Sequence, residues 1–188
     1  KTLMAINRFL GKFGLSFRKK DLLSIKEKAG FGNFDQFVVG GAHISRELSN
    51  DLKLLGITVL QGYGITECSP LISVNSMTSC EMGSVGHVVP SCQIKFVDDE
   101  ILVKGPNVMQ GYYKNPELTK EAFDEDGWFK TGDLGYMDKN GFLYINGRKK
   151  NLIVCKNGNK ISPEMLEALL APLPIVKEVL VSATTGGE

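Results

Sequence analysis

The sequence is poor in the residues that build a zinc site or a disulfide framework. It holds four cysteines and two histidines in 188 residues, and no two cysteines form a CxxC pair. We therefore expect neither kind of site, and such cysteines fit a reducing cytoplasm. Lysine and arginine number 22, against 21 aspartates and glutamates. The net charge thus gives no reason to expect nucleic acid or an anionic membrane as a partner.

Long apolar runs are missing too, and no stretch approaches the length of a transmembrane helix. Glycine is plentiful, at 21 residues, and hydrophobic residues make up 43% of the chain. That is enough for the core of one domain or parts of two. The chain begins with Lys1 and stops shortly after an apolar run at 176–182, and we expect it to be a segment of a longer protein.

The stretch 61–67 is the most informative part of the sequence. It follows the apolar, β-branched run 57–60, which predicts a buried strand. Gly62 and Gly64 then allow a tight turn and a close approach of the backbone to a ligand, which a Cβ would obstruct. We therefore expect a loop at 61–67 that directly follows a strand.

Three side chains in this loop suit a nucleotide and its metal ion. Tyr63 offers a flat aromatic face, Thr66 a hydroxyl for a phosphate oxygen, and Glu67 a hard carboxylate for Mg²⁺. The alternative is a polar turn in which the tyrosine leans on the core.

The preceding residues predict a βαβ unit. Residues 37–39 are typical of a strand, and Ser45 can cap a helix that runs to about residue 55 and stops at Gly56. Ligands of parallel sheets gather outside the carboxyl ends of the strands. The glycine-rich turn 40–43 and the loop 61–67 would both lie at that edge.

Beyond about residue 83 the pattern favours short strands and turns, and we expect a compact, mostly antiparallel subdomain. Between two of the expected strands lies Asp133, in Thr131-Gly132-Asp133. Its carboxylate can accept two hydrogen bonds from a ribose diol; the alternative is an aspartate in an ordinary turn. Arg148, directly after Gly147, can reach a ribose or phosphate oxygen, or belong to a solvated basic turn.

The last forty residues predict the start of a small α+β domain. Residues 152–154 and 160–161 can form a hairpin about Asn157-Gly158. Ser162-Pro163 begins a helix, and residues 176–182 favour one further strand.

Five groups of residues resemble, in order and spacing, the motifs of the AMP-forming acyl-CoA synthetases, a superfamily that also includes luciferases and the adenylation domains of peptide synthetases. The resemblance runs from about residue 36 to the end and is greatest to the long-chain fatty-acid CoA ligases. The groups are Gly40-Gly41-Ala42, Tyr63-Gly64-Ile65-Thr66-Glu67, Gly105-Pro106 with Gly111-Tyr112, Thr131-Gly132-Asp133 and Arg148-Lys149-Lys150.

The resemblance implies an α/β plus β fold. Residues 1–82 would end an α/β subdomain that binds nucleotide and acyl group and contains the βαβ unit. Residues 83–146 would form a small β-barrel-like subdomain, which completes the C-terminal part of the large adenylate-forming domain. Residues 147–188 would be a hinge and an incomplete α+β lid domain.

The implied activity is an AMP-forming acid–thiol ligase. Such an enzyme activates a fatty acid with ATP and Mg²⁺, forms an acyl-adenylate and pyrophosphate, and passes the acyl group to coenzyme A. A related enzyme could instead load an acyl carrier protein or use an aryl acid. A non-catalytic nucleotide-binding module is the alternative outside enzymes.

The resemblance also assigns roles to particular residues. Those carried over as cofactor-binding are Gly41 and Ala42 beside adenine, Gly62, Tyr63 stacked on adenine, Gly64 beside the acyl carboxylate, Thr66 on the α-phosphate, and Asp133 and Arg148 on the ribose. Thr66, Glu67 and Arg148 would be catalytic, with Glu67 the ligand of Mg²⁺.

This chain departs from the family pattern at two positions. His43 stands where the family often has proline, and Gly147 stands at the hinge position that is commonly aspartate. The phosphate loop of the family lies upstream of these motifs and its distal lysine downstream. We therefore expect this chain alone to make no acyl-adenylate.

Overall fold

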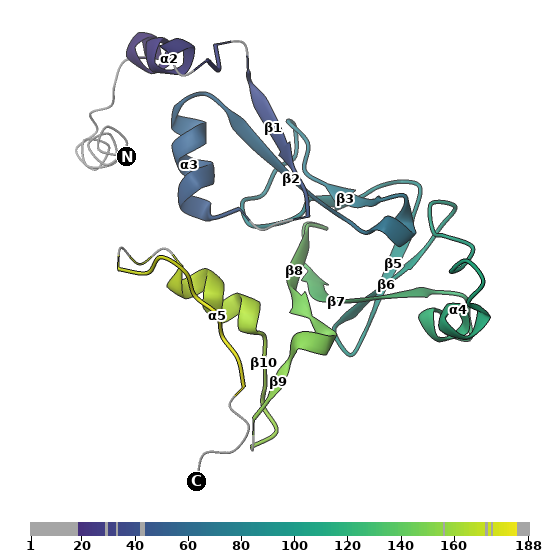
Figure 1. Ribbon diagram of the computed structural model, residues 1–188. Coiled ribbons are helices and arrows are strands. Elements are labelled where there is room, and N and C mark those ends of the chain that lie inside the picture. Colours follow the sequence, from purple (N-terminus) through teal and green to yellow (C-terminus); the bar gives the residue numbers. More distant parts are fainter. Residues whose placement is uncertain are drawn as a thin grey trace.

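The computed structural model describes residues 19–28, 30–32, 34–41, 44–155, 157–171, 173 and 175–183. Within these ranges the chain forms two four-stranded sheets, a two-stranded hairpin and several short helices (Figure 1). The residues Ala42 and His43 lie outside the described ranges. The elements are α2 Lys19–Lys28, β1 Gln36–Val39, α3 Arg46–Leu54, β2 Thr58–Gly64, η1 Thr66–Cys68, β3 Leu71–Val74, β4 His87–Val88, β5 Gln93–Val97, β6 Glu100–Lys104, α4 Pro116–Ala122, β7 Phe129–Met137, β8 Leu143–Arg148, η2 Lys149–Asn151, β9 Ile153–Val154, β10 Lys160–Ile161 and α5 Pro163–Leu170.

The predicted βαβ unit is confirmed. Strands β1 and β2 pair in parallel, and α3 connects them. The side chain of Ser45 caps α3 by accepting a hydrogen bond from the backbone of Leu48 at 3.2 Å, which satisfies one of the free amides at the helix start. Gly56 follows the helix with φ +75°, as expected of a glycine stop.

Strand β2 is longer than its apolar run indicates. It continues to Gly64, and its second half pairs antiparallel with β3. The prediction of a loop directly after residue 60 was therefore wrong. The glycine serves strand packing, because a Cβ on Gly64 would lie 2.1 Å from the carbonyl oxygen of Pro70.

The second sheet is an open antiparallel meander in the order β5-β6-β7-β8. Thr131-Gly132-Asp133, predicted to lie between strands, instead lies inside β7. These residues form a bulge, because the register between β6 and β7 shifts there. A bulge keeps the strand continuous while it redirects the side chains that it carries.

The two sheets share one hydrophobic core. They are joined where Leu143 of β8 exchanges backbone hydrogen bonds with Val85 and Gly86, at 2.8 and 2.9 Å. Buried side chains from both sheets pack at this junction, so the position of each sheet depends on the other. They are Tyr63, Cys68, Ile72, Val85, Cys92, Ile101, Val103, Phe129 and Leu143.

The C-terminal segment forms the predicted hairpin, β9 with β10, and the predicted helix, α5. The strand expected at 176–182 is absent among the described residues of that stretch. The backbone amide of Val181 instead donates to the side chain of Glu167 on α5, at 2.9 Å. Figure 1 shows α5 (yellow-green) and the hairpin below the first sheet.

In the part of the chain that the structure describes, no helix has both the length and the apolar character needed to cross a bilayer.

The cysteines should differ sharply in reactivity. Burial raises the pKa of the Cys68 thiol to about 12 and also raises the pKa of Cys92. Burial raises the pKa of the Cys80 thiol as well, but Cys80 is exposed whereas Cys68 and Cys92 are buried. Because the reagent must reach the thiolate, we expect iodoacetamide at a pH of about 8 to label Cys80 well before Cys68 or Cys92. Timed alkylation with peptide mass spectrometry measures this, and equal rates in native buffer would contradict the burial of Cys68.

Candidate active site

The centre of the candidate site is the carboxylate of Asp133, which is only 5% exposed. Tyr63 donates its hydroxyl to Oδ2 of Asp133 at 2.7 Å. The Nε of Arg148 lies 2.9 Å from Oδ1 of the same carboxylate. Three residues that the sequence singled out therefore meet at one point, although Tyr63 and Asp133 are 70 positions apart in the chain.

The pairing of strand β7 with strand β8 explains the contact between Asp133 and Arg148. The residues are register partners on β7 and β8, so their Cα atoms are held opposite each other by the sheet. Arg148 is the last residue of β8, and about half of its side chain (49%) is exposed. A buried carboxylate is thus paired with a guanidinium that still reaches solvent.

Tyr63 takes part through its hydroxyl, while its ring packs in the core between the sheets. The residue is 9% exposed. Burial raises the pKa of the phenol far above its ordinary value, and the neighbouring Asp133 raises it further. Tyr63 therefore stays a neutral hydrogen-bond donor throughout the physiological range.

The bulge that carries Asp133 is held by side chains. The hydroxyl of Thr131 donates to the carbonyl of Ile101 at 2.7 Å and accepts from the amide of Asp133 at 3.0 Å. The amide of Gly132 donates to Oε1 of Glu100 at 3.1 Å. Gly132 has φ +72°, a conformation in which glycine is free of strain.

Thr66 and Glu67 lie just beyond the end of β2, in the 3-10 turn η1. The hydroxyl of Tyr112 donates to Oε1 of Glu67 at 3.1 Å, and the backbone carbonyl of Glu67 accepts from the amide of Met109 at 2.7 Å. Burial, followed by the neighbouring Glu67, raises the pKa of the Tyr112 phenol. Thr66 is exposed, and Glu67 is half-buried.

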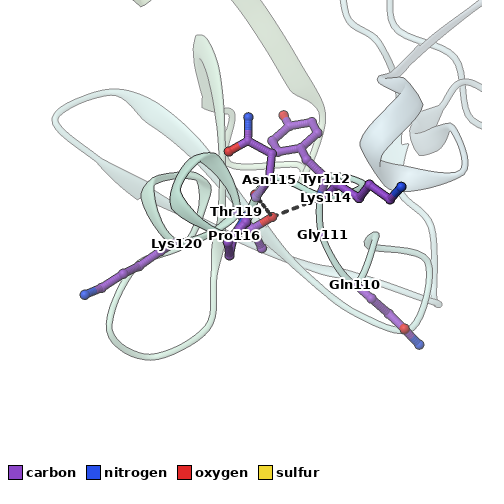
Figure 2. Close-up of a pocket in the computed structure, with 8 residues that line it drawn as sticks. All are labelled: Gln110, Gly111, Tyr112, Lys114, Asn115, Pro116, Thr119 and Lys120. Atoms are coloured by element: carbon purple, nitrogen blue, oxygen red, sulfur yellow. Dashed lines mark hydrogen bonds between the residues drawn. The ribbon is translucent and has the colours of Figure 1, made fainter.

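The loop that holds Glu67 is itself braced. The hydroxyl of Thr119 accepts from the amide of Tyr112 at 2.9 Å and donates to the carbonyl of Asn115 at 2.8 Å, as the dashed lines in Figure 2 mark. These residues line a shallow recess of about 560 Å³. At the end of η1 and the start of β3, the side-chain amide of Asn107 donates to the carbonyls of Cys68 and Leu71, each at 3.1 Å.

Sequence reasoning missed Tyr112 and Asn107 as partners of this turn. Gly105-Pro106 and Gly111-Tyr112 had been recognised only as parts of a motif, without a role. No signal in the sequence pointed to the contact, because Glu67 and Tyr112 are 45 positions apart in the chain.

The first glycine-rich turn lies beside β2. A Cβ on Gly40 would come within 3.7 Å of the carbonyl oxygen of Gly62, so the end of β1 is adjacent to the middle of β2. Gly41 is exposed with φ +76°. The neighbouring Ala42 lies outside the described residues.

Glu67 is the one residue for which a metal role was predicted. Within the described ranges, no three His, Cys, Asp or Glu side chains are grouped closely enough to hold a metal ion. Mg²⁺ in nucleotide sites is commonly held by one or two carboxylates together with waters and substrate phosphates. A single half-buried carboxylate next to the hydroxyl of Thr66 fits such an ion.

The solved structures that resemble this chain include a CoA synthetase with different ligands bound. The o-succinylbenzoate CoA synthetase of Bacillus subtilis in complex with its acyl-adenylate intermediate matches 92% of this chain and 42% of its own length, with a TM-score of 0.74 and 30% identity. The same enzyme in complex with ATP and magnesium matches 87% of the chain and 41% of its own length, with a TM-score of 0.70 and 30% identity.

The sequence matches point to the same class. The family described as "AMP-binding enzyme" matches residues 3–113. A long-chain-fatty-acid–CoA ligase of Mycobacterium bovis, FadD15, is 40% identical over 80% of this chain and 25% of the ligase. A probable 4-coumarate–CoA ligase of Dictyostelium discoideum is 35% identical over all of this chain and 36% of its own length.

The chain belongs to the AMP-binding enzyme family. It spans about a quarter to a third of the length of the curated relatives that it matches. The resemblance read from the motifs and the expected α/β plus β fold class are confirmed. The subdomain that was expected to be barrel-like is an open four-stranded sheet among the described residues.

Proposed function

We propose that this chain supplies the AMP-binding part of an acid–CoA ligase that activates a fatty acid with ATP and transfers the acyl group to coenzyme A. The observation that carries the proposal is the buried carboxylate of Asp133, which is bonded to both Tyr63 and Arg148. A buried carboxylate needs bonded partners wherever it lies. What supports a ligand here is that one of the partners, Arg148, is half exposed and extends the carboxylate toward solvent.

Asp133 would hold the ribose hydroxyls. An ionised carboxylate can accept about four hydrogen bonds. The two contacts from Tyr63 and Arg148 leave room for two donors from a ribose diol. Because Arg148 is half exposed, its remaining N–H groups could reach a ribose or phosphate oxygen at the same time.

The phosphate side of the site would be formed by Thr66 and Glu67. The exposed hydroxyl of Thr66 can donate to an α-phosphate oxygen, and Glu67 would be a ligand of Mg²⁺. When bound, the ion neutralises phosphate charge during the attack of the carboxylate. Tyr112, which donates to Glu67, would fix the orientation of that ligand. We assign Gly41, Ala42, Gly62 and Gly64 to the walls of the adenine and acyl sites.

Stacking of Tyr63 on adenine stays a prediction. It needs an open ring face, whereas the residue is 9% exposed and packs in the core. The hydroxyl contact to Asp133 is the role that the geometry supports.

A fatty acid is the favoured substrate because two of the relatives, from Mycobacterium bovis and from Escherichia coli O6:H1, are named long-chain-fatty-acid–CoA ligases at 40% and 38% identity. An aryl acid is the second candidate. It is favoured by the 4-coumarate ligase of Dictyostelium, whose match covers the whole chain.

We also propose the division into residues 1–82, 83–146 and 147–188. The first sheet, the meander and the C-terminal hairpin with α5 support it, although β4 adds residues 87–88 to the first sheet. A reducing, cytoplasmic setting is supported by the free cysteines of the described chain.

Calorimetry with non-hydrolysable acyl-sulfamoyl adenosines tests this function. We expect saturable binding that AMP displaces and GMP does not, and tighter binding of a long-chain analogue than of a coumaroyl one. Glu67→Gln should remove the Mg²⁺ dependence of ATP binding and leave AMP binding within about twofold, because AMP needs no metal bridge between its phosphates. Absence of saturable binding would refute the proposal, and preference for the coumaroyl analogue would favour the aryl acid.

A further inference from the structure

Glu100 is a buried acid to which neither the motifs nor the proposed function gives a task. It is the first residue of β6 and is 6% exposed. Placing a carboxylate out of water is costly unless both of its oxygens are well bonded. Both are: Oε1 accepts from the amide of Gly132 at 3.1 Å, and Oε2 accepts from Nζ of Lys149 at 2.7 Å.

The first contact shapes the bulge that carries Asp133. Leu102 pairs with Lys130, and Glu100 pairs with Leu134. Between these two pairs, two residue steps along β6 therefore correspond to four along β7. The extra residues lose their regular ladder partners, and an amide buried there without an acceptor would be destabilising. Glu100 supplies that acceptor for Gly132, the residue directly before Asp133.

The second contact of Glu100, to Lys149, acts on the turn that follows Arg148. Lys149 directly follows Arg148 and begins η2. Its hydrogen bond to Glu100, followed by the attraction of the two charges, raises the pKa of the Lys149 ammonium. The lysine is therefore charged at neutral pH, and its bond to Glu100 fixes where the chain leaves β8.

We propose that Glu100 is a positioning residue for the nucleotide site: its two oxygens set the bulge that presents Asp133 and the turn that presents Arg148 relative to each other. This inference rests on the proposed function, because it concerns how well the pair of Asp133 and Arg148 is placed to receive a ribose. Glu100 itself touches neither residue's functional group and would not contact the ligand.

Two single substitutions remove the ion pair with Lys149 and keep the acceptor for Gly132. Glu100→Gln keeps an acceptor for Gly132 and removes the charge that faces Lys149, whereas Lys149→Met removes only the ammonium. We expect each to weaken binding of an acyl-sulfamoyl adenosine by about fivefold, and the double variant to be no worse than either single one, because both act through one ion pair. Glu100→Ala, which removes both contacts, should weaken binding by about thirtyfold.

The matched control is the ion pair between Lys95 and Asp124, which joins β5 to the turn before β7 at the same 2.7 Å. Asp124→Asn removes a comparable pair without touching the bulge, and we expect ligand affinity to stay at the wild-type value. The nitrogen-15 amide resonance of Gly132 gives a second readout: it should shift in Glu100→Ala and stay in place in Asp124→Asn.

The outcomes separate the two proposals. If wild-type protein binds no adenylate, the proposed function fails, and this inference fails with it. If wild-type protein binds the analogue and the variants of Glu100 and Lys149 bind it as tightly as Asp124→Asn does, Glu100 serves only the stability of the sheet and the inference is overturned. Independent, additive losses in Glu100→Gln and Lys149→Met would also overturn it.

Discussion

Replacing Asp133 by alanine is expected to weaken binding of an acyl-adenylate analogue by about a hundredfold, because the substitution removes every acceptor offered to the ribose. It also leaves Arg148 without its carboxylate, which lies 2.9 Å from Nε in the native protein. Isothermal titration of wild type and Asp133→Ala measures the effect. Comparable affinities would show that the ribose is not held at this carboxylate.

A second consequence of the same substitution concerns stability. The hydroxyl of Tyr63, which is buried and bonded to Asp133 at 2.7 Å, would lose its acceptor. An unsatisfied buried hydroxyl costs about 1–3 kcal/mol, so part of any loss of binding could reflect partial unfolding. Urea denaturation of the same variant therefore accompanies the binding measurement.

Two milder variants separate binding from folding. Asp133→Asn keeps the shape of the side chain and one acceptor oxygen, and we expect an intermediate loss of affinity of about tenfold. Tyr63→Phe removes the buried donor and leaves the carboxylate for the ribose. Its affinity should equal or exceed that of the wild type, since the tyrosine hydroxyl no longer occupies Oδ2. A large loss in Tyr63→Phe would instead assign the phenol itself to the ligand.

A large effect on folding is expected for Gly64→Ala. The added Cβ would lie 2.1 Å from the carbonyl oxygen of Pro70, 2.7 Å from its carbon and 3.0 Å from the Cα of Leu71. All three are backbone atoms, so no side-chain rotation can relieve the overlap. Strand β3 would have to move away from β2, and we expect the free energy of unfolding to fall by about 3 kcal/mol or more.

Gly40→Ala is the matched control for this substitution. Its Cβ would meet only the carbonyl oxygen of Gly62 at an ordinary 3.7 Å, and we expect a change of less than about 0.5 kcal/mol. Denaturation midpoints of the two variants, measured with a common slope, give the comparison. Equal midpoints would mean that β2 and β3 are not packed as described.

Local features of the fold could be predicted from the sequence. The capping hydroxyl of Ser45, the glycine stop at Gly56 and the parallel pairing of β1 with β2 could all be predicted, because each depends on residues that are close together in the chain. The two motifs that contain Tyr63 and Asp133 predicted that both residues belong to one site. It could not show that they touch, since that contact bridges 70 positions.

Features that need a distant partner were the ones missed. The glycines of β2 were interpreted as a turn. Gly62 instead faces Ser73 and Val74 of β3, and Gly64 faces Pro70 and Leu71 at the start of that strand. The bulge in β7 exists only in relation to β6. The run 176–182 has the composition of a strand, but a strand needs a neighbour for its backbone, and Val181 bonds to Glu167 instead.

Gly147 determines how closely helix α5 can pack against strand β8. It has φ +138°, and a Cβ there would come within 2.3 Å of Oγ of Ser162 and 3.0 Å of Oε2 of Glu164. The bare backbone at this point lets the start of α5 rest directly on β8. A larger residue there would displace the side chains of Ser162 and Glu164, which are hydrogen-bonded to each other at 2.7 Å, and so loosen the packing of α5 against β8 without a direct effect on either sheet.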